Sequence, residues 1–352
     1  MLHPEFKLND IKFSSAEALK EHATFLIKRA KDDEVAIGAF ILEWLDNNDF
    51  IIVKTSGSTG TPKDIQLQKK NVYNSASATI AYFGLLEGTK ALLCLPSEYI
   101  AGKMMLVRAM IAGWDLHTSA PEKNPLEKTQ ESFDFTAMVP YQVFHSFGDL
   151  HRVKKLIIGG GAVPWKLEEE LQSLPTKIFA TYGMTETISH IAVRPINGKQ
   201  KSIIFSALPK VDFSLTSNGC LQINAPKISK ETVITNDVVE LVSSTSFRFL
   251  GRVDNVINSG GVKVHPEAVE EKLSRYIKES FFIASQEDSA LGERVIIIVE
   301  SGKQLLLEEF SEAFKNLSSY EKPKKIYTLP QFVYTETGKV KRTEVLKEIF
   351  NT

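Results

Sequence analysis

Strand-like and helical segments alternate through the first half of the chain, and this alternation limits the possible folds more than any other feature. A helical region at 15–46 comes first. Strand-like runs follow at 49–56, 90–96, 133–140, 154–164 and 176–187, separated by helical segments at 71–85, 101–113 and 164–174. Strands that alternate with helices form βαβ units and a mainly parallel sheet. We therefore expect an α/β fold.

The pattern changes after about residue 200. Residues 203–251 are rich in strand-forming residues, and "SNG" at 217–219 predicts a hairpin turn. A helix at 265–280, strands at 281–288 and 293–301, and a helix at 305–317 follow. We expect a large N-terminal domain (1–250) of mainly parallel sheets flanked by helices plus a β-rich segment. A small, mobile α+β C-terminal domain (251–352) should follow, with a hinge near Asp254.

Charge and cysteine content exclude several classes of protein. Lys and Arg number 42 against 43 Asp and Glu, whereas a dedicated nucleic-acid binder normally carries a basic excess. The two cysteines, Cys94 and Cys220, lack the spacing of a metal site and favour a reducing compartment. The N-terminus has no apolar signal region, and apolar runs are too short for membrane insertion. We expect a cytoplasmic protein; homo-oligomerisation stays open.

The run "TSGSTGTPK" at 55–63 follows a strand-like segment and predicts a phosphate-binding loop. Its Gly57, Gly60 and Lys63 do not have the Walker A spacing. Small residues nevertheless let successive backbone N–H groups face an anion, and hydroxyls and a lysine add donors. A flexible linker is the alternative, but a linker seldom carries Pro-Lys directly after such a run.

Further polar segments follow later strands and could join the same site. Ligands of parallel sheets gather at the carboxyl ends of strands, so the loops after residues 54, 158 and 180 should converge. "TYGMTET" at 181–187 supplies the carboxylate of Glu186, suited to Mg²⁺ beside phosphate. "ITND" at 234–237 ends in Asp237, which could bind ribose hydroxyls. "TETGKVKR" at 335–342 presents Lys339 after a glycine.

Five stretches of the sequence, taken in order along the chain, resemble the signature motifs of the acyl-adenylate-forming superfamily. This superfamily includes acyl-CoA synthetases, firefly-luciferase-like enzymes and peptide-synthetase adenylation domains. They are "TSGSTGTPK", "YGMTET", "TND", "GRVDNVINSGGVKVHPEAVE" and "TGKVKR". Any one would be a weak signal, but five in order span 55–342. The resemblance implies an enzyme that uses ATP, Mg²⁺, a small carboxylic acid and coenzyme A.

The resemblance also implies residue roles in nucleotide binding. The phosphates of ATP would contact Thr55, Ser56, Gly57, Ser58, Thr59, Gly60 and Lys63. A wall beside adenine and the acyl group would comprise Gly159, Gly160, Gly161 and Ala162. Tyr182 would stack on adenine next to Gly183, and Thr185 would touch the α-phosphate. Glu186 would bind Mg²⁺, and the ribose hydroxyls would contact Asp237 and Arg252.

Other implied roles concern catalysis and domain motion. Lys339 would bridge the substrate carboxylate and the α-phosphate during adenylation. Asp254 would be the hinge about which the C-terminal domain rotates. That rotation would withdraw Lys339 and bring the face carrying Gly260 and Gly261 to the site, where the thiol of CoA displaces AMP.

Three positions depart from the family pattern, and the chain is short before the phosphate loop. Asp64 replaces the glycine that usually follows the loop lysine, so we expect its carboxylate to face away from phosphate. Asn236 replaces the glycine of the T-G-D motif. Tyr99 replaces the histidine that often gates the acyl pocket. The short N-terminal region implies a reduced N-terminal subdomain.

Within the family, "YIAGKMMLVRAMIAG" and "TYGMTETISHIAVR" resemble the o-succinylbenzoate–CoA ligases of menaquinone biosynthesis. A dicarboxylic substrate needs a cation for the carboxylate that does not react. Lys103 and Arg108 lie in an otherwise apolar helix and could supply it, although both side chains could instead extend to solvent. His190 and Tyr99 could line the acid pocket, but a structural role for His190 is equally compatible.

Three other functions remain open from the sequence. The chain could be a different aryl- or acyl-CoA ligase, or an adenylation enzyme that loads a carrier protein. A non-catalytic nucleotide-binding protein is a third possibility. The retention of Lys63, Glu186, Asp237, Arg252 and Lys339 argues against the last.

Overall fold

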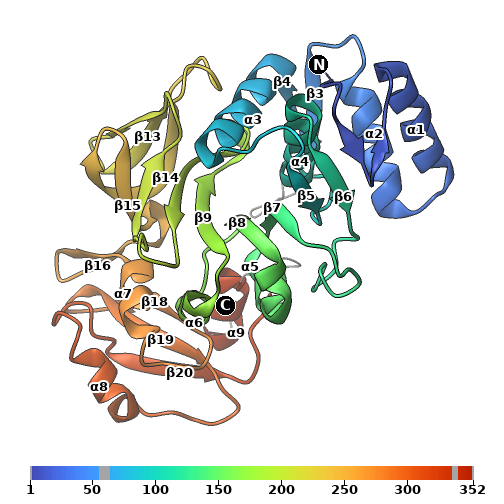
Figure 1. The fold of residues 1–352 in the computed structure, drawn as a ribbon. Helices are drawn as coiled ribbons and strands as arrows, with labels where there is room; N and C mark the ends of the chain where they lie inside the picture. The colour runs from blue at the N-terminus through green and yellow to red at the C-terminus, as the bar shows by residue number, and fades with distance from the viewer. Residues whose placement is uncertain (1, 55–63, 335–339, 351–352) are drawn as a thin grey trace.

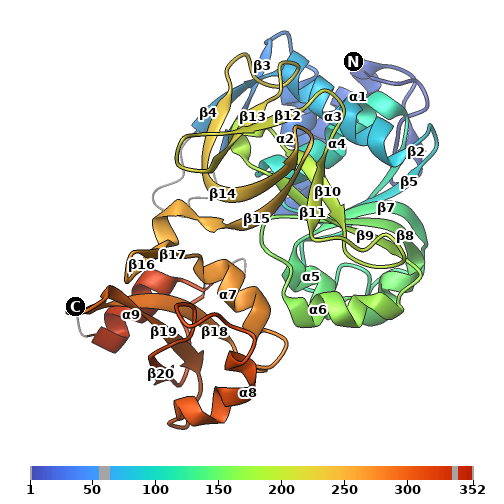
Figure 2. The same ribbon diagram turned by 90° about the vertical axis from the view of Figure 1, so that its left-hand side faces the viewer.

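The computed structural model describes residues 2–54, 64–334 and 340–350 (Figures 1 and 2). Two separate sheets divide the chain into an N-terminal part, through β15, and a C-terminal part, from β16. In Figure 1 the C-terminal part, coloured orange to red, lies beneath the N-terminal part and close to α5 and α6. None of the helices in the described ranges is long and apolar enough to span a membrane.

The helices and strands have the following bounds. Strands of the N-terminal part are β1 (Lys7–Leu8), β2 (Ile11–Lys12), β3 (Phe50–Lys54), β4 (Asp64–Gln68), β5 (Lys90–Leu93), β6 (Asp115–Thr118), β7 (Phe133–Met138), β8 (Val153–Ile158), β9 (Lys177–Gly183), β10 (His190–Pro195), β11 (Ile204–Ala207), β12 (Asp212–Leu215), β13 (Cys220–Asn224), β14 (Val233–Ser243) and β15 (Ser246–Arg252). Its helices are α1 (Ala16–Lys28), α2 (Asp32–Trp44), α3 (Lys69–Phe83), α4 (Ile100–Ala112), α5 (Pro140–His145) and α6 (Trp165–Glu170). The C-terminal part contains β16 (Ile257–Ser259), β17 (Val262–Val264), α7 (Pro266–Leu273), β18 (Phe281–Asp288), β19 (Gly292–Glu300), α8 (Ser311–Phe314), β20 (Lys325–Leu329) and α9 (Arg342–Phe350).

Five parallel strands form the centre of the large sheet, in the order β6-β5-β7-β8-β9. Antiparallel strands β10, β11, β15, β14, β13 and β12 extend it on one side. The predicted α/β class is therefore confirmed, and β12 and β13 form the hairpin expected at 217–219. The first predicted strand, β3, does not join this sheet: it pairs only with β4, as a separate antiparallel hairpin.

The central strands are buried on both faces, which explains their nearly continuous apolar sequences. On β5, Ala91 and Leu93 pack into the cluster that includes α4, whereas Leu92, and Cys94 just after the strand, pack on the opposite face. That second cluster contains Val143 of α5 and Leu167 of α6. Helices therefore cover both faces of the parallel centre, as predicted from the alternating pattern.

The small sheet has its own two-sided core. Val295, Ile297 and Val299 of β19 pack on the face covered by α7 and α8, while Ile296 and Ile298 pack against the face that contacts α9. The helix predicted at 305–317 is shorter than expected. A 3₁₀ turn and the single-turn helix α8 replace it, because the backbone at Phe310 (φ −104°, ψ 10°) interrupts the helix. The division into two domains agrees with these separate cores but remains a prediction.

Helix α4 is buried around most of its circumference, and its lysine has a structural partner. The Nζ of Lys103 donates to the carbonyl of Ile52 at 2.6 Å and to Glu43 Oε2 at 3.1 Å. The other oxygen of Glu43 accepts from the N–H of Ile52 at 2.6 Å. The two side chains thus complete the backbone hydrogen bonds of β3 and join it to α2 and α4.

We predict that Lys103→Met lowers the free energy of unfolding by about 1–3 kcal/mol, because it leaves the Glu43 carboxylate and a strand carbonyl without their donor. Lys70→Met, on the exposed side of α3, is the matched control and should change stability by less than about 0.5 kcal/mol. Urea denaturation of both variants measures the difference. Equal stability of the two variants would contradict this structural role.

Candidate active site

The carboxyl ends of β8 and β9 lie at the same edge of the sheet because these strands are parallel neighbours. The glycine-rich segment 159–162 leaves β8 there. A Cβ on Gly159 would lie 2.8 Å from the hydroxyl of Thr181, and Gly160 has φ +77°. Glycine is therefore needed at both positions, and the loops after 158 and 180 converge as predicted. The loop after 54 lies outside the described residues, and its strand β3 does not belong to the parallel sheet from which its convergence was predicted.

Asp237 and Arg252, predicted from separate motifs, are directly paired across β14 and β15. Arg252 Nη1 lies 3.4 Å from Asp237 Oδ1, and the phenol of Tyr182 donates to Asp237 Oδ2 at 2.5 Å. Asp237 is 8% exposed, whereas about half of the Arg252 side chain is accessible. The structure brings these three predicted nucleotide residues together, with one carboxylate at their centre.

Tyr182 is held from two sides. Its ring packs edge-on against Phe247, with centroids 5.0 Å apart, and Phe205 lies at 5.8 Å. Burial, and secondly the charge of Asp237, raise the pKa of the Tyr182 phenol, so the hydroxyl stays protonated and remains a donor. This arrangement fixes the ring at the end of β9.

The segment after β9 turns sharply, and glycine is essential at its start. A Cβ at Gly183 would lie 2.4 Å from the carbonyl oxygen of Ser189. The hydroxyl oxygen of Thr187 lies 3.0 Å from the Met184 carbonyl and 2.9 Å from the Ser189 carbonyl, and these two carbonyls share its one proton. The same oxygen accepts from the N–H of Met184 at 3.0 Å. These bonds fix the 3₁₀ turn Thr185–Thr187, in which two of the predicted catalytic residues lie.

Glu186 lies exposed on this turn, which fits the predicted binding of Mg²⁺. Among the described residues, the only cluster of three metal-ligand side chains is Asp10, Asp115 and His117, on other elements. Glu186 therefore belongs to no described all-protein cage. Mg²⁺ usually keeps several waters and binds one or two carboxylates together with substrate phosphates. A single accessible carboxylate beside a nucleotide site suits this coordination.

Ile188 has an unusual backbone conformation, with φ +66° and ψ −57°. The N–H of Ser189 donates to the carbonyl of Thr187 at 2.7 Å, which makes this a strained γ-turn around a β-branched residue. The side chain of Ile188 is 2% exposed and packs in the main core. The turn directs the next side chain, Ser189, toward α3 and α4.

Arg108 of α4 is a buried arginine without a carboxylate partner among the described residues. It is 2% exposed, and its closest oxygen partner is Ser189 Oγ at 3.4 Å from Nη2. Its Nε has no hydrogen-bond partner, and no carboxylate in the described ranges pairs with it. Burial lowers the pKa of Arg108 to about 9, so the guanidinium is still charged at pH 7.

Hydroxyl groups and His190 surround this guanidinium. Ser75 and Ser189 share a hydrogen bond of 2.8 Å, and Thr79 Oγ1 lies 3.3 Å from His190 Nε2. Thr79 donates to the Ser75 carbonyl, which leaves its oxygen to accept from His190 Nε2–H. Burial, and secondly the charge of Arg108, lower the pKa of His190, so its ring is neutral. We call Arg108, Ser189, Ser75, Thr79 and His190 the Arg108 cluster.

The other two predicted acid-binding residues lie in different surroundings. The ammonium group of Lys103 is bound to Glu43 and Ile52, which favours Arg108 as the cation available to a ligand. Tyr99 directly precedes α4 and is 40% exposed. Its role at the acid pocket stays a prediction.

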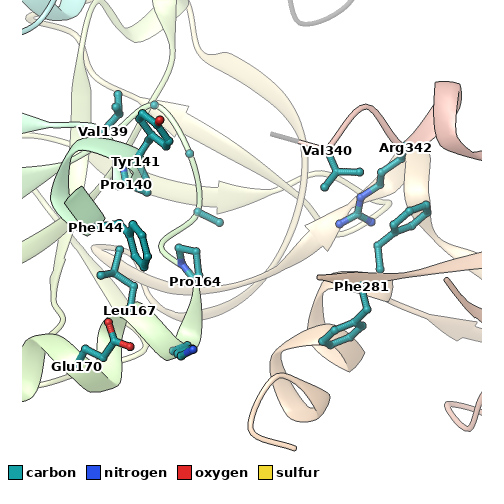
Figure 3. A pocket seen from close by; sticks show the side chains of 15 residues that line it. Val139, Pro140, Tyr141, Phe144, Pro164, Leu167, Glu170, Phe281, Val340 and Arg342 are labelled. Carbon is teal, nitrogen blue, oxygen red and sulfur yellow. The ribbon is translucent and has the colours of Figure 1, made fainter. Parts of the chain in front are cut away.

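A cleft of about 570 Å³ separates the N-terminal and C-terminal parts (Figure 3). On one side, Gly160, Gly161 and Ala162 line it together with apolar residues of α5 and α6. On the opposite side, Val340 and Arg342 of the last predicted motif line it. The glycine wall and the segment that follows Lys339 in the sequence therefore share one cleft.

The remaining predicted residues lie elsewhere or outside the described residues. Asp254 bonds Arg252 at 3.0 Å, just after β15. Gly260 and Gly261 form the turn between β16 and β17, with φ +58° and +80°, and the N–H of Gly260 donates to the carbonyl of Leu291. The residues outside the described ranges are Thr55, Ser56, Gly57, Ser58, Thr59, Gly60, Lys63 and Lys339. Asp64 is exposed at the start of β4.

Sequence reasoning missed three members of the Arg108 cluster: Ser75, Thr79 and Ser189. The first two are fully buried at positions i and i+4 of α3, on the same side of that helix. Two hydroxyls at this spacing amid apolar neighbours were the only available signal, and it is weak because helical Ser and Thr can bond to their own backbone.

Comparisons with known proteins agree with these observations. A 2-succinylbenzoate–CoA ligase of Escherichia coli is 25% identical over 329 residues, covering 88% of this chain and 71% of that protein. A solved acyl-CoA synthetase (AMP-forming)/AMP-acid ligase II-like protein of Dyadobacter fermentans is 34% identical. It covers 92% of this chain and 98% of its own, with a TM-score of 0.62.

The fold is also similar to that of o-succinylbenzoate CoA synthetase from Bacillus subtilis in complex with the acyl-adenylate OSB-AMP. The TM-score is 0.71 at 20% identity, over 84% of this chain and 68% of that one. The sequence profile of the AMP-binding enzymes matches residues 9–215, more than half of the chain. The family predicted from the five motifs is thus confirmed, and the chain belongs to the AMP-binding enzymes.

Proposed function

We propose that this protein is an ATP-dependent acid–CoA ligase whose acid is 2-succinylbenzoate. It forms an acyl-adenylate and then a CoA thioester, as a step of menaquinone biosynthesis. Family membership supports the ligase chemistry, and the names of relatives such as the E. coli ligase support this acid. ATP and CoA as substrates favour a cytoplasmic location.

The nucleotide would lie at the carboxyl ends of β8 and β9. Asp237 and Arg252 would bind the ribose hydroxyls, because Asp237 Oδ1, an acceptor, lies 3.4 Å from Arg252 Nη1, a donor. The ring of Tyr182 would contact adenine opposite the wall formed by Gly160–Ala162. Glu186 would hold Mg²⁺, which when bound offsets the negative charge of the phosphates.

Two displacements account for the reaction. In the first, a carboxylate oxygen of the acid attacks the α-phosphorus of ATP, and pyrophosphate leaves. In the second, the sulfur of CoA attacks the acyl carbon, its proton is lost, and AMP leaves. Lys63 and Lys339 would lower the repulsion between the acid and the triphosphate in the first step. A rotation of the C-terminal part about Asp254 would then bring Gly260 and Gly261 to the site for the second.

The observation that carries the choice of acid is the buried guanidinium of Arg108. A buried charge without a charged partner is expensive, and the described residues offer it only a hydroxyl at 3.4 Å and the weakly accepting sulfur of Met105 at 3.9 Å. A carboxylate can bind both guanidinium nitrogens at once and also accept from Ser189. An acid with a second carboxylate, such as 2-succinylbenzoate, would supply that partner while its other carboxylate reacts.

A panel of acids tests the proposed function. With ATP, Mg²⁺ and CoA, 2-succinylbenzoate should give a CoA thioester, AMP and pyrophosphate at least tenfold faster than benzoate or fatty acids. Separation of the thioester by liquid chromatography provides the measurement. Absence of a 2-succinylbenzoate thioester would refute the assignment. Transfer only to a phosphopantetheinyl carrier protein would instead identify a carrier-loading enzyme.

Arg108→Met should raise the stability of the protein and lower its activity. The charged guanidinium has a lower pKa in the folded protein than in the unfolded chain, so at pH 7 its burial opposes folding. Methionine should therefore raise the free energy of unfolding by about 1–4 kcal/mol in the absence of substrate. The same variant should lose activity toward 2-succinylbenzoate.

Arg152→Met is the matched control for Arg108→Met. Arg152 is also mostly buried, but its guanidinium pairs with Asp149 at 2.7 Å, so its loss should lower stability. Denaturation curves and initial rates measure both effects. A destabilised Arg108→Met protein, or one that retains full activity, would count against carboxylate binding by the Arg108 cluster.

Lys339→Ala should affect the two half-reactions differently. Loss of this lysine should slow adenylation by roughly 10²–10³-fold, the typical effect of removing one preorganised charge. Thioester formation from presynthesised acyl-adenylate should continue at the wild-type rate. ATP–pyrophosphate exchange and single-turnover thioester assays provide the two readouts. An equal loss in both would rule out the rotation for this protein.

A further inference from the structure

Three glutamates of α7 lie on one side of that helix and contact three different elements. Glu267, Glu270 and Glu271 occupy positions i, i+3 and i+4, which share a face in an α-helix. Figure 2 shows α7 between β15 of the large sheet and β18 of the small one. The helix is therefore placed to connect the two parts of the chain.

Two of these glutamates dock α7 against the large sheet. Glu271 Oε2 accepts from Arg248 Nη2 of β15 at 3.4 Å. The carboxylate of Glu267 lies against the end of β15, where a Cβ on Gly251 would be 2.3 Å from its Oε2. The carboxylate therefore lies directly on the backbone of Gly251, and β15 and α7 are in direct apposition next to the proposed hinge.

Glu267 also reaches the hinge itself. Its Oε1 accepts from Asn255 Nδ2 at 2.5 Å, and Asn255 is the next residue after Asp254. A rotation about Asp254 would move α7 relative to β15 and would therefore break the contacts of Glu267 with Gly251 and of Glu271 with Arg248.

The third glutamate holds the C-terminal segment. Glu270 accepts from Arg342 Nη2 at 2.8 Å and from the N–H of Ile283 at 2.8 Å. The guanidinium of Arg342 also lies over the ring of Phe282, 5.4 Å from its centroid. Val340, two residues before Arg342, forms a β-bridge with Tyr334. The stretch that begins at Val340 is thus fixed to α7 and to the small sheet.

The two sets of contacts differ in strength. Arg248 and Glu271 are 33% and 40% exposed, and such half-exposed pairs contribute little net stability. The side chains of Glu270 and Arg342 are 18% and 32% exposed, so this pair is the more buried of the two. Glu270 also accepts from the backbone N–H of Ile283, which anchors it within the C-terminal part. A rotation would therefore break the first pair more readily than the second.

We propose that the acidic face of α7 holds the C-terminal part in its adenylation orientation, with Arg248–Glu271 as the breakable docking pair and Glu270–Arg342 as the permanent one. In this orientation Val340 and Arg342 line the same cleft as Gly160–Ala162. The proposal rests on the two-step reaction proposed above. It assigns Arg248, Glu270, Glu271 and Arg342 as positioning residues, because none of them needs to touch the substrate.

Charge reversal of the docking pair tests the proposal. Arg248→Glu and Glu271→Arg should each slow ATP–pyrophosphate exchange by about two- to tenfold, since a like-charge contact replaces an attractive one. Thioester formation from presynthesised acyl-adenylate should keep its rate or become faster. The double variant R248E/E271R restores opposite charges and should recover exchange to within about twofold of the wild type.

The pair Lys272–Glu321 provides a matched control. Lys272 also lies on α7, but its Nζ bonds Glu321 at 2.7 Å within the C-terminal part. Lys272→Glu should leave both half-reactions unchanged, and thermal melting confirms that each variant is folded. Equal losses in both half-reactions, or failure of the double variant to recover, would overturn the proposal. A wild-type protein without any exchange would instead refute the proposed function.

Discussion

The parallel pairing of β8 with β9 is the constraint on which the rest of the site depends. Since the two strands run in the same direction, their carboxyl ends deliver the glycine segment 159–162 and Tyr182 to one edge of the sheet. The antiparallel strands that follow then bring β14 and β15 alongside, and their register places Asp237 opposite Arg252. Residues from distant motifs meet because of strand order alone, in keeping with the general position of ligand sites in open α/β sheets.

Much of this arrangement could be predicted from the sequence. Strands buried on both faces are continuous apolar runs, so the segments at 90–96, 133–140 and 154–164 were recognisable without a structure. The motif resemblance predicted Asp237, Arg252 and Tyr182, and the structure brings them together. The positions of β3 and β4 could not be predicted in the same way. A half-exposed strand has the same pattern in a separate hairpin as at the edge of a large sheet.

The two basic residues of α4 show why the site was less predictable than the fold. In the sequence, Lys103 and Arg108 are equivalent, since each is a single charge in an apolar helix. Glu43, 60 residues earlier, provides a charged partner for Lys103, whereas the described residues around Arg108 provide hydroxyls, a thioether sulfur and a neutral histidine but no carboxylate. Whether a buried charge has a partner is a long-range property, and no local pattern of the sequence records it.

The strained γ-turn at Ile188 affects how the acid specificity of this protein could change. Thr185 and Glu186 lie in the same six-residue segment, 185–190, as Ser189 and His190, and the strained residue Ile188, packed in the core, joins the two pairs. A substitution that reshapes this segment to admit a different acid would also displace the residues proposed to face the nucleotide. Ser75 and Thr79 of the Arg108 cluster lie on α3, outside the turn, and bond to Ser189 and His190. Selection or engineering for new acids would therefore meet the least resistance on α3, where the proposed acid site can vary while the proposed nucleotide site keeps its geometry.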